Sequence, residues 1–307
     1  MTNRMKKKQR WELFDVVNVF LMLVLLVLIS YPLYFTVIAS FSEPDAVASG
    51  KVTLWPIEPS LSIYEHVFTY KQLWIGYGNS IINTVLGTCF NLLLTIPAAY
   101  VLSKRDLPHR NLITLFFMIT MYFSGGLVPK YLQVKNLGLL DTRLVLILMG
   151  GISVYNLIVT RTYFSNSIDS ALYEAAEIDG ADEFKKFFSV ALPLAKPIIA
   201  VMVLYYAVSH WNNYFDAMIY TSDKNLETLQ LVLRRILVMN QSALNPEIMA
   251  ELMASSTEEF KLAMERADMA YTMKYAMVFI ASAPLLVAYP FVQKYFVKGI
   301  MIGAVKG

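Results

Sequence analysis

A short segment in the middle of the chain combines small and acidic residues in a pattern that suits docking against another protein. Residues 174–180 read Glu-Ala-Ala-Glu-Ile-Asp-Gly, and after nine further residues the chain continues as Val-Ala-Leu-Pro over 190–193. On a helix, the two alanines would make one face small enough to enter a groove, and the two glutamates could pair with basic groups there. Such a knob would pass a rigid-body movement to the elements attached to it. An ordinary pair of interfacial helices is the alternative, and the spacing alone does not separate the two. The residues expected to take part are Glu174, Ala175, Ala176, Asp179, Gly180, Leu192 and Pro193.

The chain offers little that could make or break covalent bonds. It lacks the Gly-x-x-x-x-Gly-Lys-[Ser/Thr] loop that cradles phosphates, so energy from ATP would have to come from a partner. His66, His109 and His210 do not form a metal-ligand cluster, and a single cysteine excludes an internal disulfide. We expect that cysteine, Cys89, to be a small packed residue. The sequence therefore predicts no catalytic residue, no metal site and no cofactor in this chain.

The composition is that of a membrane protein. Of 307 residues, 57% are hydrophobic and only 16% are charged, and the mean hydropathy is +0.50, whereas an average soluble domain is about 45–50% apolar and about 25% charged. This excludes a disordered chain and argues against an ordinary soluble enzyme. The net charge of +3 is spread along the sequence, which argues against nucleic-acid binding.

Six apolar runs are long enough to be membrane spans, which need about 20 residues as helices. Since backbone groups in lipid must be paired internally, we expect an all-α integral membrane protein. Polar and helix-breaking residues interrupt the end of the third run, which is therefore the least regular. The expected spans are 14–39, 80–102, 112–128, 144–163, 193–219 and 275–297.

Basic residues predict the orientation of these spans. With the N-terminus in the cytoplasm, the inner segments carry Lys and Arg at about twice the density of the outer ones, as the positive-inside rule expects. An even number of spans also places the C-terminus in the cytoplasm. We expect the first span to be retained, because its apolar run is longer than the roughly 7–15 residues of a signal peptide. The basic cluster that contributes most to this orientation is Arg4, Lys6, Lys7, Lys8 and Arg10.

Two loops are too structured to be simple connectors. In the cytoplasmic loop 164–192, Asp169 or Ser170 can cap a first helix, Gly180 can end it, and Asp182 can cap a second helix over 183–190. Pro193 would then open the fifth span.

The outer segment 221–274 holds apolar residues at helical spacing from Leu226 to Ile236, with a second such hint from Met249 to Met253. It could be a structured cap or a docking surface for an extracellular partner.

The pattern in the cytoplasmic loop resembles a known signature. Glu-Ala-Ala, three residues, Gly, nine residues and Ile-x-Leu-Pro form the "EAA" signature of membrane subunits of bacterial ABC importers, and the one departure here is Val190 in place of Ile. The resemblance covers nearly the whole chain. It is to the binding-protein-dependent carbohydrate permeases, in particular the smaller subunit of the maltose type and its LplC/YtcP-like branch for oligosaccharides and polysaccharide fragments. It rests further on Pro129-x-Tyr131, Leu137-Gly138-Leu139-x-Asp141-Thr142, Trp211-Asn212 and the ending 293–307.

The resemblance implies a set of partners. A related second permease subunit would form a heterodimer with this chain, two ATP-binding subunits would bind ATP and Mg below it, and an extracellular solute-binding protein would dock outside. Each ATPase would receive one coupling helix in a groove. The tail residues Lys298, Gly299 and Gly303 would reach the ATPase, and 221–274 would contact the binding protein. The implied setting is the bacterial plasma membrane and its lipid.

Polar and aromatic residues inside the spans are candidates for a translocation path. Polar groups there are costly and usually face a protein interior or a water-filled route, and asparagine with aromatic rings suits sugar hydroxyls and ring carbons. Hydrogen bonding between helices and an aromatic belt are the alternative explanation. The candidates are Asn83, Asn156, Trp211, Asn212, Asn213 and Asp216.

The expected organisation has two parts. Residues 1–79 hold the N-terminal cytoplasmic segment, the first span and an outer loop, and residues 80–307 form a five-helix importer core with the EAA loop 164–192. The expected function is sugar uptake by alternating access, driven by ATP in partner subunits. A permease for amino acids, peptides or anions remains a rival. A secondary transporter is a further rival, although it should show buried charge pairs or an internal repeat.

Overall fold

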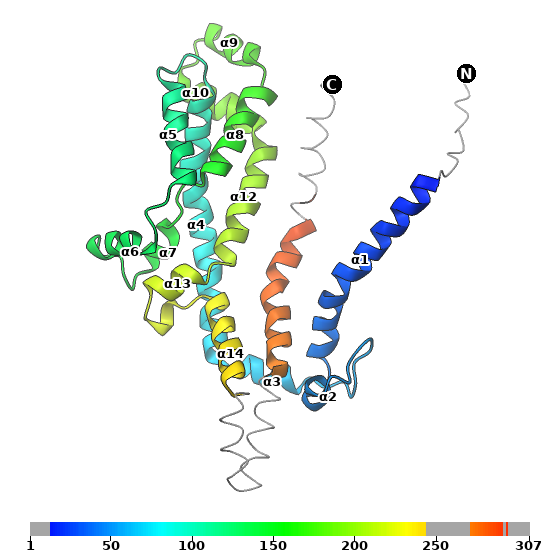
Figure 1. Cartoon of the computed structure of the whole chain (residues 1–307). Helices are drawn as coiled ribbons and strands as arrows, with labels where there is room; N and C mark the ends of the chain where they lie inside the picture. The colour runs from blue at the N-terminus through cyan, green and yellow to red at the C-terminus, as the bar shows by residue number, and fades with distance from the viewer. Residues whose placement is uncertain (1–12, 244–270, 291–292, 294–307) are drawn as a thin grey trace. The chain divides into compact units, whose positions relative to one another are not determined.

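The computed structural model describes residues 13–243, 271–290 and 293, and every regular element within them is helical (Figure 1). The chain divides into two compact units. The first contains residues 1–69 and 239–280, and the second contains residues 70–238 and 281–307.

The first unit is built around a long apolar helix. α1 (Leu13–Ser40) is followed by α2 (Pro44–Ala48) and α3 (Ser62–Thr69), and residues 271–280 of the helix Tyr271–Pro290 join them. None of the most apolar window of α1 is buried inside the protein, and a helix that is apolar all round without a protein partner suits lipid. Only its last turn, including Ile38 and Ala39, enters a small core.

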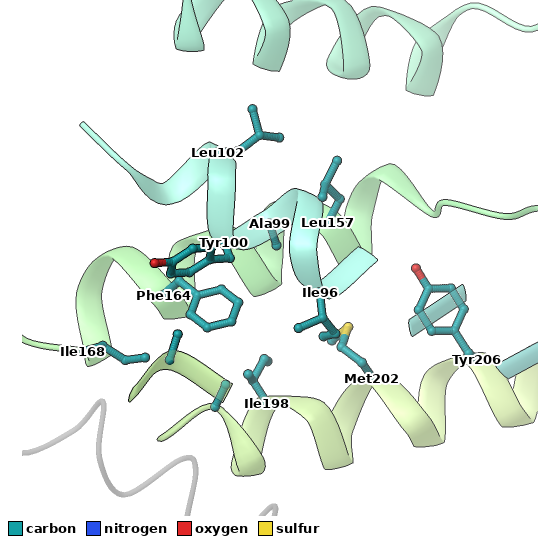
Figure 2. Packing of buried hydrophobic residues seen from close by; sticks show 12 residues of the cluster. Ile96, Ala99, Tyr100, Leu102, Leu157, Phe164, Ile168, Ile198, Met202 and Tyr206 are labelled. Carbon is teal, nitrogen blue, oxygen red and sulfur yellow. The ribbon is translucent and has the colours of Figure 1, made fainter. Parts of the chain in front are cut away.

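The second unit is organised around α4 (Lys71–Ser103), which packs against α8 (Val154–Ser167) and α12 (Lys196–Trp211). Their contact surface is apolar at the end of α4 that leads into Lys104 (Figure 2), where Tyr100 meets Phe164 edge to face. The remaining helices are α5 (Arg110–Tyr122), α6 (Leu127–Asn136), α7 (Arg143–Leu148), α9 (Ser170–Ile178), α10 (Glu183–Lys186), the π-helical turn η1 (Phe187–Ala191), α11 (Leu192–Leu194), α13 (Phe215–Tyr220), the 3₁₀ turn η2 (Lys224–Leu226) and α14 (Leu229–Ala243).

The expected spans are only partly continuous helices. Among the described residues, α1, α4 and Tyr271–Pro290 are each long and apolar enough to cross a membrane. Two bent pairs raise the number to five if each pair is one span, namely α5 with α6, bent by 111°, and Glu183–Leu194 with α12, bent by 77°. The fourth expected run, 144–163, is divided between α7 and α8, so the count of six spans stays a prediction.

The bend before α12 corrects one detail of the sequence analysis. The second short helix does not end at Val190 but continues through η1 and α11, so Pro193 lies inside this run and the bend falls at Ala195. Proline cannot donate a hydrogen bond and its ring crowds the carbonyl four residues earlier, which a widened π-helical turn relieves. Pro197, in the first turn of α12, takes the position that Pro193 was expected to fill.

Cys89 is exposed rather than packed within this chain. The outer segment agrees better with expectation, because α14 begins at Leu229 and buries Leu229, Val232 and Leu233. Leu226 belongs to η2 instead. The second helix suggested near Met249 lies outside the described residues.

Candidate functional site

The cytoplasmic segment forms two helices joined by a tight turn, as its capping residues predict. The Asp169 carboxylate accepts a hydrogen bond from the Ala171 amide at 3.1 Å and starts α9. Gly180 follows α9 with φ of +75°, a left-handed conformation that favours glycine. The Asp182 carboxylate accepts from the Lys185 amide at 2.8 Å and starts α10. Local sequence therefore fixes the angle at which α9 leaves the rest of the segment.

α9 presents an open surface. Glu174, Ala175 and Asp179 are exposed, and Ala176 is half-buried. Ile178, at the end of the helix, is 88% exposed. Small, acidic and apolar side chains thus lie together on a helix with no partner for that surface within the described residues.

One lysine next to α9 is buried and doubly paired. Lys186 Nζ lies 2.8 Å from Glu177 Oε2 and 3.0 Å from Glu183 Oε1, so one oxygen of the exposed Glu177 carboxylate is engaged within the chain. Burial and the nearby Glu183 carboxylate raise the pKa of the Tyr173 hydroxyl to about 12, so it stays protonated at neutral pH. The sequence analysis missed Lys186, although the Glu183–Lys186 spacing of i, i+3 on a helix was a usable signal.

A polar cavity of about 280 Å³ lies in the second unit, among α8, α12 and the segments that flank them. Three of the residues predicted from sequence line it: Asn156, Asn213 and Asp216. Asn156 is buried at the wall of this cavity. Asn91, a polar residue of the expected second span, lines it too. The polar lining residues that the sequence did not point to are Lys130, Ser153, Tyr205, Tyr206, Ser209 and His210.

The other three path candidates lie elsewhere. Trp211 is buried, donates its indole N–H to the Ala281 carbonyl at 3.1 Å and packs edge to face on Tyr77. Asn212 is exposed at the C-terminal cap of α12. Asn83 is buried without a hydrogen-bond partner in the described part of the chain. These contacts fit the alternative explanation of bonding between helices, and the place of Trp211 in the path stays a prediction.

The wall of the cavity is held by a polar brace between helices. Asn91 on α4 donates its amide to the carbonyls of Gly150 and Gly151, at 3.0 and 2.9 Å, where the chain breaks before α8. Its oxygen lies 2.7 Å from Nε2 of His210 on α12. Because the amide already donates to two carbonyls, the oxygen accepts from an Nε2–H group.

The tail residues Lys298, Gly299 and Gly303 lie outside the described residues. Among the residues that the structure does describe, no group of three or more His, Cys, Asp or Glu side chains could hold a metal ion.

Comparison with known proteins identifies this arrangement. Residues 73–302 match the family described as "Binding-protein-dependent transport system inner membrane component". The chain belongs to this family. Its members are transport subunits of the plasma membrane rather than enzymes, which confirms the family predicted from the EAA signature.

Individual relatives match nearly the full length of this permease. It is 36% identical over 296 residues to the polygalacturonan/rhamnogalacturonan transport system permease protein YtcP of Bacillus subtilis, covering 96% of this chain and 99% of that one. It is also 36% identical over 296 residues to protein LplC of the same organism, covering 96% of each. A crystal structure of a bacterial ABC transporter that imports the acidic polysaccharide alginate contains a chain with a TM-score of 0.78 and 33% identity, covering 96% of this chain and all of that one.

Proposed function

We propose that this permease carries an oligosaccharide or polysaccharide fragment into the cytoplasm as part of an ATP-driven importer. The observation that carries the proposal is the family match over residues 73–302, joined to near-full-length relatives whose names refer to polysaccharide transport. The polar cavity beside α8 and α12 supports it, because the amide and hydroxyl groups that line it suit sugar hydroxyls.

The family implies an extracellular binding protein and ATPase partners. In the proposed assembly this chain pairs with a second, related permease, and two ATP-binding subunits hold ATP and Mg. The chain lies in the lipid of the plasma membrane with both termini in the cytoplasm. Residues 1–79 precede a transport core over 80–307 that contains the EAA loop 164–192.

In the proposed mechanism, α9 is the coupling helix. Its exposed Glu174, Ala175 and Asp179 suit a groove on the ATPase, and the fixed turn at Gly180 makes its movement a rigid one. Closure of the ATPases on ATP moves the coupling helices together and opens the cavity outward, and hydrolysis returns it inward. The remaining coupling contacts are assigned to Ala176, Leu192, Pro193 and the tail residues Lys298, Gly299 and Gly303.

The translocation path is assigned to the polar cavity. Asn156, Asn213 and Asp216 are the predicted path residues that line it. Asn83, Trp211 and Asn212 are not among the residues that line this cavity, and their part in the path stays a prediction.

The test is uptake into proteoliposomes that hold the complete transporter, with its binding protein added outside. Labelled oligogalacturonides and a neutral oligosaccharide of equal length are compared with peptides and amino acids. The proposal expects uptake of at least one of the sugars that requires both ATP and the binding protein. Uptake without ATP, or uptake of peptides or amino acids alone, would overturn it.

The coupling role of α9 has its own test. Gly180→Trp places a large side chain at the turn beside α9 and should uncouple ATP hydrolysis from uptake while the chain remains inserted in the membrane. Normal uptake by a stably expressed variant would contradict this role.

A further inference from the structure

Lys186 joins the two sides of the Gly180 turn. Its side chain is 7% exposed, and its two carboxylate partners come from α9 on one side of the turn and from α10 on the other. A buried ammonium group is costly unless it is paired, so the two helices are held at a defined angle wherever this lysine stays charged.

Glu183 extends the contact to the end of the central span. Its second carboxylate oxygen lies 3.5 Å from Lys104 Nζ, just beyond the last turn of α4, and accepts a hydrogen bond from the Tyr100 hydroxyl at 3.2 Å. Lys104 and Glu183 are far apart in the sequence, so this contact exists only in the folded protein.

Lys104 also touches α9 directly. Its ammonium group lies 4.0 Å from the centre of the Tyr173 ring and 4.6 Å from that of Tyr100. Cation–π contacts strengthen when they are desolvated, and the Lys104 side chain is only 21% exposed. α9 is therefore connected to α4 by two routes, through Tyr173 and through the chain of charges from Glu177 to Glu183.

We propose that Lys186 and Lys104 are positioning residues that lock the coupling helix α9 onto the cytoplasmic end of α4. With this lock in place, a push on α9 moves α4. Without it, the connection from α9 through Glu183 to the end of α4 is lost, and less of the push reaches α4. This inference rests on the proposed function of α9 as the coupling helix. It adds the connection by which that helix would drive the central span.

The first measurement concerns geometry and does not depend on transport. In a Cys89→Ser background of the complete transporter, spin labels are attached through Ala171→Cys on α9 and Arg105→Cys beyond α4, both at exposed positions. Lys186→Met should broaden the distance distribution between the labels. Lys186→Arg should keep it narrow, because it retains the charge.

Lys185→Met is the matched control. Lys185 is the neighbouring lysine and is exposed, so its replacement removes the same charge without removing the bridge. An unchanged distribution in Lys186→Met would overturn the lock.

The second measurement is the number of sugar molecules taken up per ATP hydrolysed by the reconstituted transporter. We expect this ratio to fall clearly in Lys186→Met, because the bridge that joins α9 to α10 is lost, and to change less than about twofold in Lys185→Met, since exposed charges contribute little. Lys186→Arg should restore most of the ratio. A normal ratio in a Lys186→Met transporter with a broadened distribution would overturn the role of the lock in coupling. The Gly180→Trp variant separates the two ideas. If α9 is not the coupling helix, Gly180→Trp will also transport sugar normally.

Discussion

At the scale of single residues, the polar side chains of the spans fall into two kinds. Asn91 is fully committed to its neighbours, donating to two backbone carbonyls and accepting from His210. Asn156 is also buried, but it lines the polar cavity beside α8 and α12. The first kind fixes the distances between helices, and the second is available to a hydroxylated substrate.

Replacing Asn156 should therefore weaken sugar transport. Asn156→Leu removes an amide from the cavity wall, and the loss of one or two hydrogen bonds of about 0.5–1.5 kcal/mol each should raise the KM for uptake several-fold. Asn83→Leu is the control, since Asn83 lies outside the cavity and has no partner to lose in the described structure. The measurement is the concentration dependence of uptake. An unchanged KM for Asn156→Leu would remove this residue from the path.

The contact between Asn91 and His210 can be tested at Gly87, the glycine that lies against the His210 ring. A Cβ atom at Gly87 would lie 2.3 Å from Cε1 of His210, so Gly87→Ala must displace the imidazole that pairs with Asn91. Overpacking of this kind costs about 1–3 kcal/mol, which should lower the melting temperature of the purified protein. Gly78→Ala on the same helix meets nothing within 4 Å and should leave the melting temperature nearly unchanged. Equal melting temperatures for both variants would contradict the brace.

At the scale of elements, the short helices between α8 and α12 determine how a movement of α9 could reach the spans. α9 is capped at its start and ends in a turn that needs a left-handed residue. The run Glu183–Leu194 contains a π-helical turn and meets α12 at a bend of 77°. Each of these features fixes an angle, so the segment can act as a rigid lever rather than a loop.

The turn makes a specific prediction for Gly180. Nothing lies within 4 Å of a Cβ at this position, so Gly180→Ala suffers only from its φ of +75°, which costs roughly 1–2 kcal/mol for an L-residue. We expect a measurable fall in sugar taken up per ATP, with normal membrane insertion. Gly180→Asn should be milder, because asparagine tolerates this conformation. Equal losses in the two variants would show that space, not backbone conformation, matters there.

At the scale of the whole molecule, the two described units differ in what surrounds them. The first contains α1, whose apolar side chains find almost no protein contact. The second contains the central α4, packed on α8 and α12, together with the polar cavity and the cytoplasmic segment. Surfaces left open on α1 and α9 fit a subunit that works within lipid and among partner proteins.

This leads to a prediction about composition. Purification of the tagged protein from native membranes in mild detergent, followed by mass spectrometry, should recover a second permease and an ATPase. The extracellular binding protein should join them when sugar is present. Recovery of this chain alone, with transport in liposomes that needs no ATP, would contradict the importer assignment.

The sequence by itself determined the features that depend on neighbouring residues. The caps at Asp169 and Asp182 and the turn at Gly180 are set within a few positions of the chain, so local chemistry predicts them. The spacing of the EAA signature, which is also local, was enough to indicate the family.

Only the tertiary structure decided which distant residues meet. Asn156 reached the cavity while Asn83 and Trp211 did not, and the pairing of Asn91 with His210 joins residues 119 positions apart. The contact of Lys104 with Glu183 was equally invisible in the sequence. Helical periodicity predicts which residues share a face, but the packing of α4 against α8 and α12 decides what that face meets.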